Sequence, residues 1–388
     1  MAIHQSMFSS LIGALLTNGL ALSMGCSNGE SSIPVKPVES PDTLVTFTIA
    51  AVGDLMCHST QFNYAKTGVD TFDFTPSFSL VAPILQQADL AIGNLETTLA
   101  GKARPYSGYP MFNTPDQYVS AVKQAGFDFL VTANNHSNDS GDKGIVRTIS
   151  ILDSIGLGHT GSFASANDRD SIRILDIKGV KIGIISYTFS TNGLPLADGK
   201  PWLVNMCDSA LIKKDMAAGR AKGAELMIVF YHFGEEYQRL PNAYQKQFVQ
   251  HAIDCGADVV LGSHPHVIQP MEVVAGRRFN VDSVFVAYSM GNFISNQKDQ
   301  YTDEGVIMQL TFEKHLPSGK IRLAAHNNYV PTWVYRGVAD QLKMHIIVPV
   351  SAAPGNDTKA IYLNDAYQSS ISEAKKHTDA ILHTVVPK

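Results

Sequence analysis

Short apolar runs alternate with amphipathic stretches along most of the chain from residue 44 onward. Apolar residues at helical spacing, in stretches often closed by Gly, predict helices at 115–126, 144–156 and 242–256. Near-continuous apolar strands that alternate with helices predict an α/β domain with a buried sheet. The strands are expected where β-branched and aromatic residues are stopped by polar residues or Gly, at 45–52, 88–92, 127–132, 181–187, 226–231, 259–261 and 285–288.

The pattern changes towards both ends of the chain. After residue 301 it is less regular, with strand-like stretches at 306–313 and 321–325 and a helix-like tail from Asp365. We expect this part to complete the main domain as a small C-terminal subdomain packed on its sheet. The predicted divisions are therefore a processed leader at 1–25, a flexible tether at 26–43, a main domain at 44–300 and an extension at 301–388.

The leader is an apolar stretch from Met7 to Met24 that precedes Cys26. It is at the short end for a membrane span, and a lone Cys after small residues suggests processing. The stretch resembles a bacterial lipoprotein signal peptide, with Cys26 as the lipidated first residue, although no Lys or Arg stands before it. The alternatives are an ordinary cleaved signal peptide and an N-terminal anchor. All three predict export, and the lipoprotein predicts a lipid-anchored protein of the bacterial cell envelope.

Composition narrows the class of partner. Thirty Lys and Arg residues stand against 35 Asp and Glu residues, which gives a net charge of −5 and argues against a nucleic-acid partner. Apart from Cys26, the three cysteines Cys57, Cys207 and Cys255 are odd in number and far apart, so they predict no disulfide framework.

Side chains that bind metal or phosphate follow six of the seven predicted strands. In open α/β sheets, ligands bind at the carboxyl ends of strands, and parallel strands would bring these side chains to one edge. A single His after an apolar run is most often a hydrogen-bonded structural residue, but repetition at equivalent positions favours a site. The strand-end residues are Asp54, Asn94 with Glu96, Asn135 with His136, His232, His264 with His266, and Asn292.

Imidazole, carboxylate and amide oxygen together suit borderline divalent ions such as Mn, Fe or Zn. The set is too large for one tetrahedral zinc, but it could hold two ions bridged by a carboxylate. On extended backbone, His264 and His266 would point to opposite sides. A turn directly after the strand, which Pro265 favours, would aim both into one site.

Six motifs together resemble the poly-γ-glutamate capsule synthesis protein CapA family, which is similar to the calcineurin-like metallophosphoesterases. The resemblance runs from about residue 47 to 297 and implies a four-layer αββα sandwich with its site at the strand ends. The motifs are Gly53-Asp54-Leu55-Met56-Cys57-His58, Gly93-Asn94-Leu95-Glu96, Ala133-Asn134-Asn135-His136, His232-Phe233-Gly234-Glu235-Glu236, Gly262-Ser263-His264-Pro265-His266 and Tyr288-Ser289-Met290-Gly291-Asn292.

The resemblance also implies roles for individual residues. His136 corresponds to the catalytic histidine, and Glu96 stands where an aspartate would bridge two metals. His58 lies four positions after Asp54, whereas the family's histidine lies two positions after the aspartate. The implied metal ligands are Asp54, Glu96, Asn135, His232, His264, His266 and His58.

Charged residues near His232 are candidates for binding substrate. Glu235 and Glu236 could orient His232 or bind substrate, and a solvated loop is the alternative. Arg239 could bind carboxylate or phosphate, although most loop arginines are only solvated. For Asn292 we expect a structural role, since Asn often fixes a turn through side-chain hydrogen bonds.

These patterns predict an exported, lipid-anchored, CapA-like protein of capsule or envelope polymer synthesis. Its two-metal site would hydrolyse a phosphoester or similar bond, and its partners would be an anionic polymer or phosphoester-type substrate and a membrane-bound capsule synthase. The alternative is a non-catalytic accessory that handles the polymer, with metal structural or absent. Hydrolysis of an amide bond by the same metals is a third hypothesis, and fold analogy does not decide among the three.

Overall fold

The computed structural model describes residues 43–275, 281–339, 342–350 and 365–386. The described residues from 43 onward belong to one compact unit. The predicted leader, most of the tether and Cys26 lie outside the described residues. Within the described part of the chain, no helix has the length and apolar character needed to cross a membrane.

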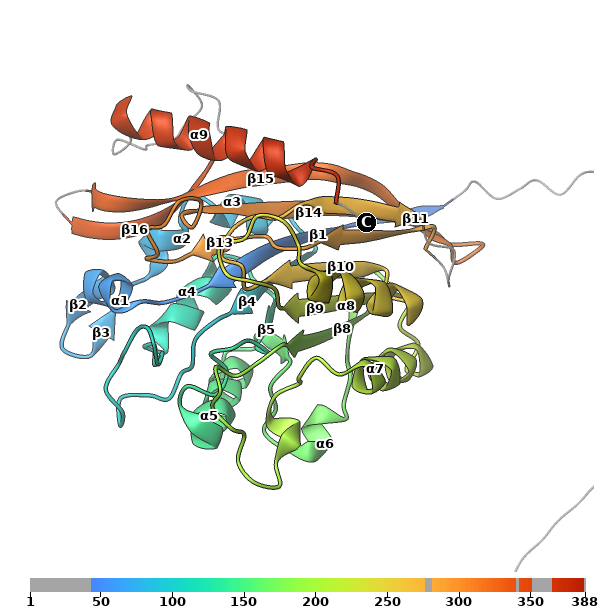
Figure 1. Ribbon diagram of the computed structural model, residues 1–388, viewed down its shortest axis with the longest axis horizontal. Coiled ribbons are helices and arrows are strands. Elements are labelled where there is room, and N and C mark those ends of the chain that lie inside the picture. Colours follow the sequence, from blue (N-terminus) through green and yellow to red (C-terminus); the bar gives the residue numbers. More distant parts are fainter. Residues whose placement is uncertain (1–42, 276–280, 340–341, 351–364, 387–388) are drawn as a thin grey trace, which may run out of the picture. The chain divides into compact units, whose positions relative to one another are not determined.

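The first sheet has eight strands (Figure 1). β1, β4, β5 and β6 are parallel neighbours, and β13 also pairs in parallel with β1. The strands are β1 (Leu44–Leu55), β4 (Leu90–Leu95), β5 (Phe129–Val131), β6 (Gly158–Thr160), β13 (Asn292–Ile294), β14 (Glu304–His315), β15 (Ile321–Ala339) and β16 (Leu342–Pro349).

The residues after 301 enter this first sheet instead of packing on it as a separate layer. β14 pairs antiparallel with β1 along residues 44–51, β15 pairs with β14, and β16 pairs with β15. The edge of β1 opposite β4 is therefore covered, which removes an exposed sheet edge.

The second sheet has six strands in the order β11-β12-β10-β9-β8-β7. The four central strands are parallel and the two edge strands are antiparallel to their neighbours. The strands are β7 (Arg173–Ile177), β8 (Val180–Thr188), β9 (Leu226–His232), β10 (Val259–Ser263), β11 (Met271–Ala275) and β12 (Ser283–Ala287). A separate pair consists of β2 (Lys66–Gly68) and β3 (Thr71–Phe72).

The two sheets face each other across the central core. In β9, Leu226, Ile228 and Phe230 enter this core, whereas Met227 and Val229 pack against the outer helices. Because side chains alternate along a strand, each central strand is apolar on both faces. This arrangement confirms the four-layer αββα sandwich that the resemblance implied.

Helices form the two outer layers. The outer face of the first sheet packs against α1 (Ser59–Ala65), α2 (Thr75–Phe78), α3 (Ala82–Leu85), α4 (Gln117–Gln124) and α5 (Gly141–Ser154). The outer face of the second sheet packs against α7 (Ser209–Ala221) and α8 (Ala243–Asp254). The remaining short turns of helix are α6 (Ala166–Arg169) and the 3₁₀ segment η1 (Pro201–Leu203).

The C-terminal helix α9 (Asp365–Leu382) runs along β15 (Figure 1). Ala374 packs there with Trp333 and Ile346, while Leu382 reaches the core between the sheets. The helix-like tail predicted from Asp365 is thus confirmed. This helix covers the part of the first sheet formed by β15 and β16.

Candidate metal centre and active site

The carboxyl ends of parallel strands from both sheets meet at one site. In the first sheet, Asp54 of β1 is in register with Asn94 of β4 and with Asn292 of β13. In the second sheet, His232 at the end of β9 is in register with Ser263 at the end of β10. The strand-end side chains therefore come together as predicted. They come from the edges of two sheets, whereas the prediction placed them along one edge of one sheet.

Two groups of metal-binding side chains share His266. One ligand atom each of Asp54, Glu96 and His266 lies within 4.8 Å of the others, and the same holds for Glu236, His264 and His266. Asp54, Glu96 and His266 are buried, whereas Glu236 is exposed at the rim. The two groups therefore adjoin at one imidazole.

Asp54 is fully buried and holds several groups in place. Its Oδ1 accepts from Asn94 Nδ2 at 2.8 Å, and its Oδ2 lies 3.2 Å from His266 Nδ1. Burial would raise the pKa of the Asp54 carboxyl, but the hydrogen bonds from His266 and Asn94 and the nearby His232 lower this pKa below its ordinary range. Asp54 is therefore a carboxylate at neutral pH.

Glu96 differs from Asp54 because its carboxyl has no hydrogen-bond partner. The side chain is fully buried, and neither oxygen has a partner among the described residues. Its Oε1 lies 3.7 Å from His232 Nε2 and 3.8 Å from His266 Nε2. Burial, together with the neighbouring Asp54, raises the pKa of Glu96 well above its ordinary range. A buried carboxylate without such a partner is costly, so a cation would stabilise the ionised form at this position.

The turn that the sequence predicted after β10 is present. His264 has φ +99° and His266 has φ +58°, on either side of Pro265. Both values lie in the left-handed region that non-glycine residues seldom adopt, so the surrounding structure must hold the turn. His264 N donates to Asp54 Oδ2 at 3.3 Å, and this contact fixes the turn against β1. The strained turn brings both imidazoles to the same side.

His232 stands between the two sheets at full burial. Its Nε2 lies 2.7 Å from Asn135 Oδ1 and 3.2 Å from His264 Nδ1. Burial, and then the neighbouring His264, lowers the pKa of His232 well below its ordinary range. Burial also lowers the pKa of His264 to about 3. Both imidazoles are thus neutral at physiological pH, which is the form that binds metal.

His136 is oriented by a carboxylate of its own. Its Nδ1 pairs with Asp139 Oδ2 at 2.8 Å, and its ring packs edge-on against Phe112 with centroids 4.7 Å apart. Asp139 Oδ2 also accepts from Phe112 N at 2.7 Å. This pairing fixes one nitrogen of His136 as a donor and leaves Nε2 for proton exchange with a substrate.

Two other predicted residues are held by different parts of the fold. His58 Nδ1 contacts Gln61 Oε1 at 3.2 Å and accepts from Asn296 N at 3.3 Å. Both contacts hold the imidazole at the N-terminus of α1. Burial lowers the pKa of His58 to about 4. The Arg239 guanidinium donates to the His377 carbonyl of α9 at 3.0 Å. This hydrogen bond connects the loop after β9 to α9.

Of the acidic pair after His232, Glu236 joins the group with His264 and His266, and Glu235 is exposed. The backbone explains the position of Glu236, because Tyr237 N donates to the Pro265 carbonyl at 2.8 Å. That contact ties the loop after β9 to the histidine turn. Glu236 thus lies at the exposed rim of the candidate metal centre, close to His264 and His266.

Two of the predicted strand-end asparagines and one further acid support the site. Asn94 Nδ2 bridges Asp54 and His232, 3.2 Å from His232 Nδ1. Asn292 Oδ1 lies 3.1 Å from His266 Nδ1, while its Nδ2 donates to Gln297 Oε1 and to the Thr302 carbonyl. These contacts agree with the structural role expected for Asn292. Asp139 lies three residues after His136, and this spacing was the sequence clue that the two side chains could pair.

The donor set fits divalent metal. Oxygen donors come from Asp54, Glu96 and Asn135, and nitrogen donors come from His232, His264 and His266. Such mixed oxygen and imidazole sets suit Mn, Fe or Zn, and the unpartnered Glu96 carboxylate supplies the charge that a cation would balance.

The sequence comparisons agree with this geometry. The family described as "Bacterial capsule synthesis protein PGA_cap" matches residues 48–297. The chain belongs to this family. A capsule biosynthesis protein CapA from Bacillus anthracis is 29% identical over 72% of this chain, and a PGA biosynthesis protein CapA from Bacillus subtilis is 28% identical over 74%. The matches cover 66% and 72% of those relatives' own lengths.

Solved structures that align with this chain include a nucleotidase and a phosphoesterase. The NAD nucleotidase NadN of Haemophilus influenzae has a TM-score of 0.48 at 15% identity, over 86% of this chain and 63% of that one. The calcineurin-like phosphoesterase YfkN of Bacillus subtilis has a TM-score of 0.42 at 15% identity, over 86% of this chain and 100% of that one. Membership of the PGA_cap family rests on the sequence match.

Proposed function

We propose that this PGA_cap protein uses a centre of two divalent metal ions to hydrolyse a phosphoester-type bond during synthesis of a capsule or envelope polymer. The observation that carries the proposal is the fully buried Glu96 carboxyl, which accepts no hydrogen bond from a described residue and lies beside the ionised Asp54. If both acids were ionised their charges would repel, and metal ions would compensate those charges.

The roles follow from the contacts. Asp54, Glu96, Asn135, His232, His264 and His266 would hold the ions, with Glu236 at the rim. Bound divalent metals polarise a phosphoryl oxygen and supply a hydroxide nucleophile at neutral pH. His136 would give a proton to the leaving oxygen from Nε2 while Asp139 holds Nδ1. Asn292 would keep His266 aimed at the centre.

Export and anchoring belong to the same proposal. We propose that the chain is exported, that Cys26 carries a lipid and that the protein works at the envelope beside a membrane-bound capsule synthase. The apolar stretch before Cys26 and the capsule family support this. A Cys26→Ala protein that still partitions with membranes through its N-terminus would count against lipidation.

The decisive experiment measures metal content and turnover on the purified full-length protein. We expect bound Mn, Fe or Zn, hydrolysis of a generic phosphodiester, and loss of both in His264→Ala. An exposed lysine variant such as Lys213→Gln serves as the matched control and should keep both. Absence of bound metal and of turnover under every divalent ion would refute the proposal.

A second candidate function is that of a non-catalytic accessory for polymer handling. The contact that favours it is Asn94 Nδ2, which donates to Asp54 Oδ1 at 2.8 Å and satisfies an oxygen that a metal would otherwise use. An accessory of this kind would show stable polymer binding with no metal-dependent turnover. The metal and turnover measurements therefore separate the two candidates.

A further inference from the structure

The loop between β9 and α8 carries Glu236 and is held from two sides. On the side of the histidine turn, Tyr237 N donates to the Pro265 carbonyl at 2.8 Å. On the other side, Arg239 Nη2 donates to the His377 carbonyl of α9 at 3.0 Å. Because Arg239 follows Glu236 by three residues, the contact with α9 acts on the same short segment that presents Glu236 to the metal centre.

Arg239 belongs to a cluster that also includes aromatic and acidic side chains. Its guanidinium carbon lies 4.1 Å from the centroid of the Tyr301 ring, and the His377 ring meets Tyr301 edge-on with centroids 5.0 Å apart. His377 Nδ1 pairs with Glu304 Oε1 at 2.6 Å. A guanidinium over an aromatic face is stabilised by a cation–π interaction in addition to its hydrogen bond. Arg239 therefore connects the loop both to α9 and to the segment that leads into β14.

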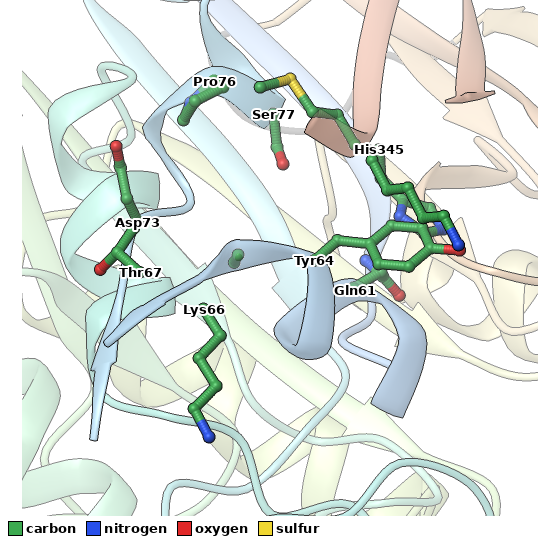
Figure 2. Close-up of a pocket in the computed structure, with 11 residues that line it drawn as sticks. Gln61, Tyr64, Lys66, Thr67, Asp73, Pro76, Ser77 and His345 are labelled. Atoms are coloured by element: carbon green, nitrogen blue, oxygen red, sulfur yellow. The ribbon is translucent and has the colours of Figure 1, made fainter. Parts of the chain in front are cut away.

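The helix that receives this contact is fixed to the first sheet. Tyr367 of α9 packs in the cluster that contains Ile346 of β16, and Leu382 reaches the core between the sheets. His345 precedes Ile346 and points to the other face of the strand, where it lines a cavity of about 340 Å³ together with Tyr64 (Figure 2). Apolar packing along one face of β16 thus makes α9 a firm support for the loop.

The backbone of the loop needs such a support. Gly234 has φ +113° and Tyr237 has φ +66°. Glycine adopts this left-handed region freely, whereas other residues seldom do, so contacts on either side must hold Tyr237. Since Tyr237 directly follows Glu236, a relaxation of its backbone would move the Glu236 carboxylate away from His264 and His266, with which it forms one of the two groups of metal-binding side chains.

We propose that Arg239 is a positioning residue for the metal centre, which holds Glu236 as a ligand of the cation at the rim by joining its loop to α9 and Tyr301. This inference rests on the proposed function, because it assumes that the centre binds two ions. The residues that match the family end at 297, whereas Tyr301, Glu304 and His377 follow that point. The rim of the centre would thus depend on a part of the chain outside the family match.

The first test titrates the metal-free full-length protein with Co²⁺, followed by calorimetry and by visible absorption, which reports the ligands of each ion. Wild type should bind two ions in two steps. Arg239→Ala should weaken the step at the rim about tenfold and leave the step at Asp54 and Glu96 unchanged. Arg239→Lys keeps a donor and a positive charge near Tyr301 and should restore most of the rim affinity.

A double-variant cycle tests whether Arg239 acts through Glu236. Glu236→Gln should weaken the rim step by a similar factor, and the double variant Arg239→Ala/Glu236→Gln should bind about as the single variants do. The matched control Arg322→Ala removes an arginine of β15 that pairs with Glu313 at 2.7 Å and should bind both ions like wild type. Multiplied effects in the double variant, an unchanged rim step in Arg239→Ala, or equal weakening of both steps would overturn the inference.

Hydrogen exchange gives a readout that needs neither metal nor turnover. The amides of residues 233–242 should exchange faster in metal-free Arg239→Ala than in wild type or Arg322→Ala, because the loop has lost its contact with α9. His377→Ala keeps Arg239 but removes the pair with Glu304, and it should speed exchange in the same loop to a smaller degree. If Arg239→Ala does not fold, His377→Ala decides the question. Unchanged exchange of this loop in the folded variants would overturn the connection.

The two proposals can fail separately. Binding of two ions without turnover of any phosphodiester would remove the hydrolase, and a rim step that still depends on Arg239 would support the positioning role. Turnover with a single bound ion would overturn the positioning role and leave hydrolysis to the buried ligands.

Discussion

Two buried acids at the ends of neighbouring strands have pKa values shifted in opposite directions. Asp54 accepts hydrogen bonds from Asn94 and His266 and stays ionised, whereas Glu96 accepts none from a described residue and has a raised pKa. The difference between them is a difference in partners, because both are fully buried. A bound cation would therefore act mainly on Glu96, because no described residue stabilises the ionised form of this acid through a hydrogen bond.

Glu96→Gln should change how stability depends on pH in the metal-free protein. The raised pKa means that folded Glu96 keeps its proton where the unfolded chain has lost it, so the free energy of unfolding falls as pH rises above about 4. Glu96→Gln removes this fall and should be more stable than wild type at neutral pH. Urea titrations in EDTA across this range measure it, with exposed Glu373→Gln as control. Parallel curves for wild type and Glu96→Gln would contradict the role of Glu96.

His136→Ala should separate chemistry from metal binding. Since His136 Nδ1 pairs with Asp139 and the ring packs on Phe112, its loss should leave the bound metal unchanged. Loss of a positioned proton donor should lower kcat for a phosphodiester about 10²- to 10⁴-fold. Asp139→Asn should give a smaller loss with a shifted pH profile, as a positioning residue would. Full activity in His136→Ala would remove the proposed role.

At the scale of elements, close backbone contacts set the geometry of the strand ends. A Cβ on Gly53 of β1 would lie 1.9 Å from the Gly291 carbonyl oxygen, and one on Gly262 of β10 would lie 2.0 Å from the Tyr288 carbonyl oxygen. Both contacts are with backbone, which cannot move aside as a flexible side chain can. The glycines before the Asp54 and His264 ligands therefore allow neighbouring chain segments to approach.

Gly53→Ala should disrupt this junction. The methyl group must separate β1 from the Gly291 segment that leads into β13, at a cost on the order of 3 kcal/mol or more in the free energy of unfolding. It should also weaken metal binding, because Asp54 follows directly. Gly68→Ala in the exposed β2–β3 pair meets only the Thr71 hydroxyl and should cost little. Chemical denaturation with metal titration measures both; equal stability of the two variants would count against this reasoning.

At the scale of the whole molecule, the candidate metal centre lies between the two sheets of the sandwich. Asp54, Glu96 and Asn135 come from the first sheet's strand ends, and His232 and His264 come from the second sheet's. Metal bound there would join the two sheets at one edge. Stability and metal binding should therefore be coupled throughout the unit formed by residues 42–388.

Added divalent metal should raise the melting temperature of the metal-free protein. At a metal concentration one hundred times Kd, binding to the native state alone adds about 2.7 kcal/mol to the free energy of unfolding. Differential scanning calorimetry should show the rise, and hydrogen exchange should slow at strand ends of both sheets. His264→Ala should lose most of the effect, whereas Lys213→Gln should keep it. Protection confined to one sheet would show that the ions do not join the two.

Much of the site was predictable because its clues are local. Apolar runs ending in Asp, Asn or His mark strand ends, and Pro265 between two histidines marks a turn. The contacts of His58 and Arg239 were not predictable, since their partners Asn296 and His377 lie far away in the chain. The support that Asn292 gives to His266 likewise depends on the pairing of β13 with β1.

The sequence by itself determined the α/β class, the apolar strands and the residues able to bind metal at their ends. A near-continuous apolar run indicates that both faces of a strand are buried, but it does not say which elements cover them. Only the tertiary structure decided that β1, β4 and β5 belong to one sheet and β8, β9 and β10 to another, and that the residues after 301 continue the first. It also decided that Glu96 accepts no hydrogen bond from the described residues, since hydrogen-bond partners depend on contacts between distant segments.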